Sequence, residues 1–227
     1  MCSNFYVLNQ KEIHPSTFAG TGKTTLVSRL AKVLKERATV LGFITEEVRD
    51  PRAGRLGFDV VELSGNERSS LARLQTSFSR SPEYLRHLPR VGRYSVTVNE
   101  FEKIAIPCLE MALASTQRRG DAVEDPTYVL IDEIGKMELF SGAFRAKVEQ
   151  LIAAISTPAS RAHLIATIPA ATRSDGLRGI ALVDSLVRRP NAVLREVRTL
   201  PTSEVHRHHL APHPSNLHVL EDTFLFD

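Results

Sequence analysis

One glycine-rich stretch, STFAGTGKTT (residues 16–25), decides how this chain is expected to fold. It ends in GKTT, as the phosphate-binding pattern GxxxxGK[ST] does, but Thr17 stands where that pattern has its first glycine. The following stretch, TTLVSRLAKVLKERA, places leucine and valine at helical spacing, which predicts an amphipathic helix that begins at the loop. A loop that opens into a helix is what a phosphate site requires. The alternative is a lysine-threonine turn before an ordinary helix.

The individual residues of this loop suit phosphate chemistry. In such a loop, backbone N–H groups and a helix N-terminus converge on the anion, and Gly20 and Gly22 let the backbone come close to it. Lys23 can reach the β- and γ-phosphates of a nucleotide, and the Thr24 hydroxyl can ligate Mg²⁺. We therefore expect a nucleotide site at this loop.

A pair of acids supplies the second half of the expected site. The run YVLIDE (128–133) is apolar until Asp132 and Glu133, which is typical of a buried parallel strand with its chemistry at the carboxyl end. Asp132 would hold Mg²⁺ through its water shell, and Glu133 would orient and polarise the attacking water. A solvated strand end is the alternative. Thr167, which ends the strand pattern HLIAT, would lie beside Asp132 and contact the γ-phosphate or the water, or would be an ordinary strand residue.

Strand and helix patterns alternate along the rest of the chain. VLGFITEEV (40–48) and LGFDVVEL (56–63) flank a turn and predict a hairpin, and RYSVTVN (93–99) predicts a strand with one wet face. Asn99 and Glu102 predict a capping box for the next helix, which Pro107 should kink or interrupt. The alternation favours a layered α/β fold with a largely parallel sheet.

An arginine-rich stretch between residues 64 and 93 has two interpretations. It carries six arginines and two acids, with few apolar residues. It is either a solvated insertion or a lid that lays an arginine on the transferring phosphate. The arginines are Arg68, Arg73, Arg80, Arg86, Arg90 and Arg93.

Composition limits the classes of protein that fit. The 227 residues suffice for one sizeable α/β domain, and 42% hydrophobic with 24% charged residues is ordinary for a folded chain. The two cysteines exclude a disulfide framework and favour a reducing compartment, so we expect a cytoplasmic location. No apolar run is long enough for a bilayer, so no membrane partner is expected. A net charge of +3 permits anionic ligands without demanding nucleic acid, and few aromatic residues interleave with the arginines, so no nucleic-acid partner is expected.

Six motifs in order resemble the cancer-related nucleoside-triphosphatase family of P-loop proteins: GTGKTT, GFITEEVR, GRLGFDVVEL, RVGRYSV, LIDEIGKMELF and ATIP. The resemblance covers roughly residues 19–210. It implies a single three-layer, RecA-like P-loop NTPase domain of the additional-strand type, with a largely parallel sheet and an antiparallel hairpin. It also implies Mg²⁺-dependent hydrolysis of nucleoside 5′-triphosphates to diphosphates, with loose preference among ATP, GTP, CTP and UTP.

The resemblance also implies roles for single residues. Lys23 and Glu133 would be catalytic, and Thr24 and Asp132 would hold Mg²⁺, partly through water. Thr167 is a candidate γ-phosphate sensor because of its place at the end of its strand pattern, not because of the resemblance. The expected nucleotide-binding set is Gly20, Thr21, Gly22, Lys23, Thr24, Thr25, Ile131, Asp132, Glu133 and Gly135.

The front of the chain departs from the family. Residues 1–18 match nothing in it, because the family runs an apolar strand straight into the first glycine of the loop, whereas here NQKEIHPST precedes the loop. We expect an atypical segment over 1–18, the NTPase domain over 19–210 and a tail over 211–227.

Two other functions fit parts of the sequence. A nucleotide or small-molecule kinase suits the length and the arginine-rich stretch, although a base beside the Mg²⁺ aspartate favours attack by water. A catalytically impaired isoform that only binds nucleotide suits the atypical front end. Release of free phosphate without an acceptor distinguishes hydrolysis from both.

Overall fold

The computed structural model describes residues 5–10, 23–77, 86–116, 125–158, 160–171 and 178–197. Its strands are β1 (Phe5–Gln10), β2 (Thr39–Asp50), β3 (Gly54–Glu62), β4 (Arg68–Leu74), β5 (Arg90–Val91), β6 (Tyr94–Val96), β7 (Thr127–Ile131), β8 (Ala162–Ile168) and β9 (Ala192–Val197). Its α-helices are α1 (Lys23–Leu34), α3 (Val98–Thr116), α4 (Gly142–Ile155) and α5 (Ala181–Val187), with single 3₁₀ turns η1 (Gln75–Ser77) and η2 (Glu138–Phe140).

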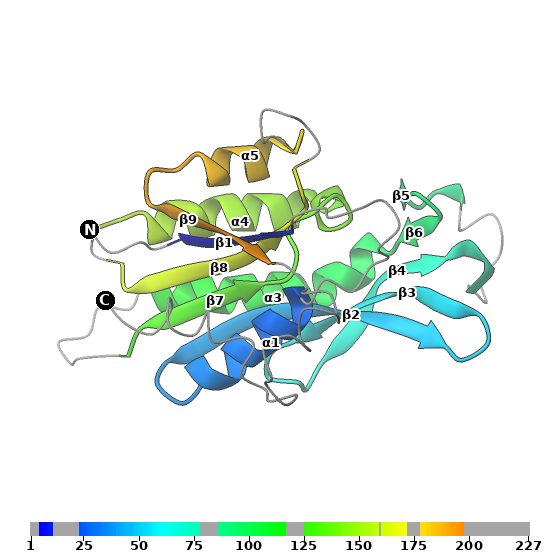
Figure 1. Ribbon diagram of the computed structural model, residues 1–227, viewed down its shortest axis with the longest axis horizontal. Helices are drawn as coiled ribbons and strands as arrows, with labels where there is room; N and C mark the ends of the chain where they lie inside the picture. Colours follow the sequence, from blue (N-terminus) through cyan, green and yellow to red (C-terminus); the bar gives the residue numbers. More distant parts are fainter. Residues whose placement is uncertain are drawn as a thin grey trace, which may run out of the picture.

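The described strands form one mixed sheet with the order β5-β6-β4-β3-β2-β7-β8-β1-β9 (Figure 1). Strands β2, β7, β8, β1 and β9 run parallel to one another. Strands β3, β4, β6 and β5 extend the sheet with antiparallel pairings that begin with the β2–β3 hairpin. The predicted α/β class, with parallel strands and an antiparallel hairpin, is confirmed.

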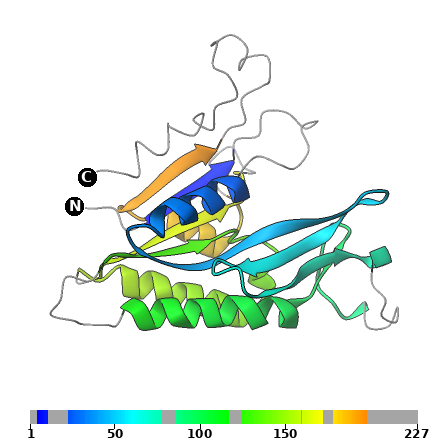
Figure 2. The same ribbon diagram turned by 90° about the horizontal axis from the view of Figure 1, so that it is seen from below.

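Helices cover both faces of the parallel part of the sheet (Figure 2). Successive residues of β7 point to opposite faces, so Leu130 packs under α1 while Val129 and Ile131 pack under α3 and α4. All three side chains are completely buried. The continuous apolar run at β7 is thus that of a strand buried on both faces, as the sequence predicts.

A glycine lets β2 and β7 approach each other closely. Gly42 has φ +118°, and a Cβ atom there would lie 1.9 Å from the carbonyl oxygen of Leu130. No side chain fits at this distance. The pairing places Phe43 opposite Ile131, so the end of β7 lies beside the middle of β2.

The atypical N-terminal segment supplies a strand inside the sheet. Strand β1 pairs in parallel with both β8 and β9, with Val7 opposite Ala166 and Leu194. The structure does not describe Thr17, the loop glycines Gly20 and Gly22, or the expected tail over 211–227. The domain boundaries therefore stay predictions.

Three local features differ from the sequence patterns. Strand β6 has no wet face, because Ser95 is fully buried and α3 already begins at Val98. The capping box does not form, since Asn99 lies inside α3 and Glu102 accepts a hydrogen bond from Ser141 Oγ at 2.6 Å. Helix α3 also runs without interruption through Pro107.

The arginine-rich stretch is not simply an insertion. Its first part is β4, a strand that pairs with β3 and β6. Arg73 forms an ion pair with Asp59 on the adjacent strand β3, and Arg68 forms one with Glu46 on β2, the strand beyond β3. Residues 78–85, which include Arg80, lie outside the described part of the chain.

Candidate active site

The site begins where α1 begins, at one end of the parallel strands (Figure 1). Thr24 Oγ1 donates a hydrogen bond of 2.5 Å to Asp132 Oδ2. Lys23 Nζ forms an ion pair with Glu133 Oε2 and donates to the carbonyl oxygen of Ile168 at 3.3 Å. The first turn of α1 is thereby joined to the carboxyl ends of β7 and β8.

Asp132 is the most densely bonded carboxylate of this site. It is 1% exposed, and its Oδ1 accepts from Thr167 Oγ1 at 2.6 Å. Its Oδ2 accepts from Thr24 and, at 3.5 Å, from Thr45 Oγ1. Three hydroxyl groups from three elements surround this carboxylate, because parallel strands end at one edge of the sheet and α1 begins there. Such hydroxyl bonds offset the cost of burying a carboxylate.

Glu133 borders a hollow of about 400 Å³. This hollow lies on the face of the sheet opposite to the one that α1 covers. Its side chain is 27% exposed, against 14% for Lys23. Apolar side chains, among them Phe58, Leu71 and Met137, form much of the wall. A carboxylate at the border of such a hollow is accessible to a small reactant.

Two carboxylates converge over Gly135. A Cβ atom on this glycine would lie 2.6 Å from Glu133 Oε1 and 3.0 Å from Glu138 Oε2. Glu138 is 5% exposed, and its Oε2 accepts from the Gly135 backbone N–H at 3.1 Å. Burial first, and then the charge of Glu133, raise the pKa of Glu138 to about 8. Glu138 is therefore protonated at neutral pH beside Glu133, whose carboxylate is paired with Lys23.

The structure brings together five residues that the sequence singles out: Lys23, Thr24, Asp132, Glu133 and Thr167. Of the other expected nucleotide contacts, Thr25 is exposed, the Ile131 side chain lies in the core, and Gly135 holds Glu138 through its backbone. Gly20, Thr21 and Gly22 lie outside the described residues. The binding and catalytic roles stay predictions.

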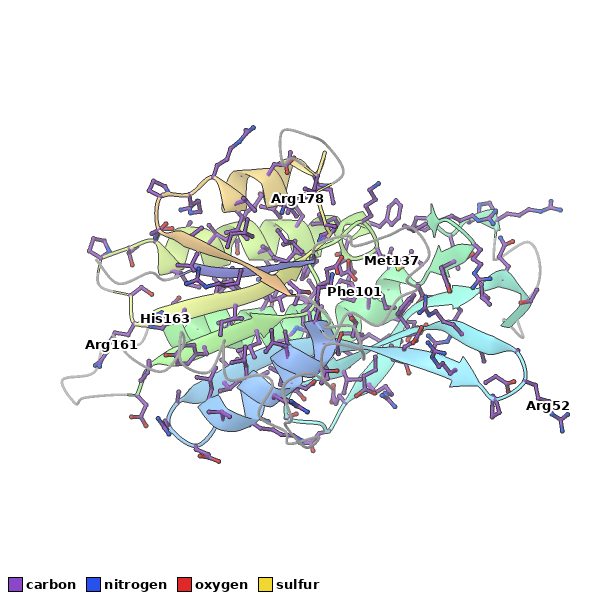
Figure 3. All side chains as sticks on the ribbon, in the orientation of Figure 1. Arg52, Phe101, Met137, Arg161, His163 and Arg178 are labelled. Atoms are coloured by element: carbon purple, nitrogen blue, oxygen red, sulfur yellow. The ribbon has the colours of Figure 1, made fainter. Side chains whose placement is uncertain are left out.

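Three residues near the site were missed from sequence. Thr45 reaches Asp132 only because of the β2–β7 register, which no local pattern reveals. Arg178 is 5% exposed, donates through Nε to the Pro169 carbonyl at 3.2 Å and borders the hollow at Glu133 (Figure 3). Glu138 had a signal, since it is an acid inside the otherwise apolar end of the motif LIDEIGKMELF.

The donor set suits Mg²⁺. A hydroxyl and a carboxylate, from Thr24 and Asp132, meet at 2.5 Å, and both offer the oxygen ligands that this cation prefers. The described residues contain no group of three or more His, Cys, Asp or Glu side chains that could hold a metal ion. Mg²⁺ in nucleotide sites is held by one or two protein groups, by phosphate oxygens and by water.

None of the helices in the described part of the chain combines the length and the apolar character needed to cross a membrane.

The α/β sheet and the lysine, hydroxyl and acidic groups at its edge define a protein of the nucleotide-hydrolysing P-loop class. The model of the family described as NTPase matches residues 13–199. The nucleoside-triphosphatase THEP1 of Aquifex aeolicus is 38% identical over 180 residues, covering 78% of this chain and 85% of that protein. The human cancer-related nucleoside-triphosphatase is 37% identical over 196 residues, covering 85% of this chain and 88% of that protein.

A solved structure agrees with these sequences. The solution structure of a human cancer-related nucleoside triphosphatase superposes with a TM-score of 0.63 at 30% identity, over 97% of this chain and 95% of that one. The chain belongs to the NTPase family, and it is a nucleoside-triphosphatase.

Proposed function

We propose that this chain hydrolyses nucleoside 5′-triphosphates to diphosphate and phosphate with Mg²⁺, with little preference for the base. The observation that carries the proposal is the double link between α1 and the end of β7, Lys23 to Glu133 and Thr24 to Asp132. We also assign the RecA-like, additional-strand arrangement. Its support is that β8 lies between β7, which carries the acids, and β1, which precedes the loop.

Lys23 connects substrate binding to the release of the Glu133 carboxylate, the general base, from its ion pair. In this structure its ammonium group neutralises Glu133. A bound triphosphate offers Lys23 a stronger, multiply charged partner, so the ammonium moves to the phosphates and Glu133 is freed. Glu133 can then act on water only when substrate is present.

The chemical step uses few protein groups. A water oxygen attacks the γ-phosphorus, the bond from that phosphorus to the β–γ bridging oxygen breaks, and Glu133 takes the proton of the water. When bound, Mg²⁺ neutralises charge that develops on the phosphate oxygens. Thr24 and Asp132 would hold it, and Thr167 keeps Asp132 in place through a bond of 2.6 Å.

Loose base preference follows from the groups involved. Lys23, Thr24 and Asp132 all act on phosphates or on Mg²⁺, which every nucleoside triphosphate shares. We expect rates for ATP, GTP, CTP and UTP that fall within about tenfold of one another, a spread of roughly 1.4 kcal/mol.

The proposed location rests on the sequence. With only two cysteines, of which Cys108 is a buried free thiol, we propose that the chain resides in a reducing compartment, the cytoplasm.

The test is phosphate release from the four triphosphates by the purified chain, with Mg²⁺ or with EDTA and without any acceptor. Lys23→Ala should abolish release, because it removes the cation expected between the β- and γ-phosphates. Lys32→Ala is the matched control, since Lys32 is exposed on the same helix. Undiminished release by Lys23→Ala would overturn the site, and phosphate transfer only when an acceptor is added would instead identify a kinase.

A further inference from the structure

A second hollow of about 560 Å³ lies beyond the one at Glu133. It is bounded by β5, by the turn and 3₁₀ helix after β7, by the start of α4 and by the segment that enters α5. Its volume is within the range of small-molecule sites. Figure 3 labels Met137 and Arg178, which line the neighbouring hollow at Glu133, and places Arg161 at the other end of the sheet.

The wall of this hollow is positively charged. Arg90, Lys136 and Arg145 come from three different elements, and none of the described residues that line the hollow is acidic. These three cations form no ion pair with a carboxylate in the described part of the chain. Like charges gathered around one cavity favour an anion, and arginine matches phosphate oxygens through parallel hydrogen bonds.

The same wall offers apolar surface. Phe140 is one of the few large hydrophobic residues that the structure exposes, with 44% of its surface accessible. Leu139 and Leu182 line the hollow beside it. An aromatic face next to cations suits a ligand that carries a flat ring as well as a charged group.

This hollow is separate from the expected triphosphate site. No residue of α1, which supplies Lys23 and Thr24, lines it. It shares Val91, Lys136 and Ile180 with the hollow at Glu133, so the two are neighbours. A ligand held here therefore lies beyond Glu133, on the side away from Lys23.

We propose that this second hollow binds a small organic phosphate with an aromatic ring, its phosphate held by Arg90, Lys136 and Arg145 and its ring on Phe140. A nucleoside monophosphate has this chemistry and serves as the probe. The proposal does not depend on hydrolysis at the first site.

The experiment is a titration of the ¹⁵N-labelled full chain with adenosine 5′-monophosphate, followed residue by residue by NMR. Amide shifts at Gly92, Phe140 and Gly179 should move together and saturate, independently of any shifts at Lys23 and Thr24. Adenosine, which lacks the phosphate, should bind at least about tenfold more weakly at this site. Shifts confined to the residues around Lys23, or equal binding of adenosine, would overturn the proposal.

Variants assign the binding to the cations. Arg145→Ala and Arg90→Ala should each lower the affinity for adenosine 5′-monophosphate about tenfold, as measured from these amide shifts. Arg161→Ala, at the amino end of β8, is the control and should leave the affinity unchanged. Arg145 lies outside the catalytic groups, so Arg145→Ala should release phosphate from ATP at the wild-type rate. Unchanged binding in both variants would contradict the site. If neither the wild type nor the variants released phosphate from ATP, the hydrolysis proposal would fail. The titration would still decide whether the second hollow binds the monophosphate.

Discussion

At the scale of single residues, Glu138 couples the site to pH. Its pKa is raised from 4.5 to about 8 by burial and by Glu133, so the folded chain holds this proton more tightly than the unfolded chain. The stabilising contribution is fully present below about pH 4.5 and is lost as pH rises through about 8. We expect the melting temperature to fall between pH 5 and pH 8, and Glu138→Gln to flatten this fall. The measurement is the melting temperature of the wild type and of Glu138→Gln from pH 5 to pH 8. If the melting temperatures of the two proteins changed with pH in the same way, Glu138 would not carry the proton.

Gly135 is needed because two carboxylates occupy the space of its side chain. Gly135→Ala would place a methyl group 2.6 Å from Glu133 Oε1, so Glu133 must move. We expect turnover to fall by about tenfold or more, since a displaced base transfers a proton poorly, with a smaller change in triphosphate affinity. Gly142→Ala is the control, because nothing lies within 4 Å of its added atom. Equal steady-state rates for the two variants would contradict the convergence over Gly135.

The residues of the site differ in how far sequence could predict them. Lys23 and Asp132 lie in short motifs whose chemistry is local, so spacing identified them. Thr45 and Arg178 reach the site from distant parts of the chain, and their positions depend on strand register and on the path of a loop. Those are tertiary properties that a pattern of residue types does not contain.

At the scale of elements, apolar runs and alternation predicted the hairpin and the central strands. The pattern failed where packing covers both sides of a short strand. Ser95 of β6 is buried although it looks like a solvent position, and Tyr94 meets Phe58 edge to face at 5.4 Å. The arginines of β4 concealed a strand, because Arg68 and Arg73 pair with acids on β2 and β3 and do not form a separate solvated insertion.

Strand β1 gives the element-scale prediction. It has neighbours on both sides, so a proline within it removes a ladder hydrogen bond and cannot be accommodated as on an edge strand. Val7→Pro should cost about 1–3 kcal/mol of stability, because it leaves a ladder carbonyl without its donor, and should lower phosphate release. Val7→Thr keeps the N–H and should cost far less. Chemical denaturation of the two variants provides the comparison. If Val7→Pro unfolded like wild type, the N-terminal segment would not be part of the sheet.

At the scale of the whole molecule, the mixed sheet separates two tasks. Its parallel half, covered by helices on both faces, brings Asp132 and Thr167 to the carboxyl ends of β7 and β8, beside the first turn of α1 (Figures 1 and 2). Its antiparallel half contributes Phe58, Leu71 and Val91 to the wall of the hollow at Glu133. The site therefore depends on the sheet being continuous from β1 to β5.

The central claim is that Glu133 activates water while Lys23 and Asp132 bind the Mg²⁺–nucleotide. The most direct measurement is single-turnover phosphate release by Glu133→Gln, with the ATP affinity of the same variant determined alongside it. We predict release slowed by two or more orders of magnitude, about 3 kcal/mol or more of barrier, because the amide cannot take the proton, with ATP and Mg²⁺ still bound. Release at the wild-type rate, or loss of binding as large as the loss of rate, would contradict the account.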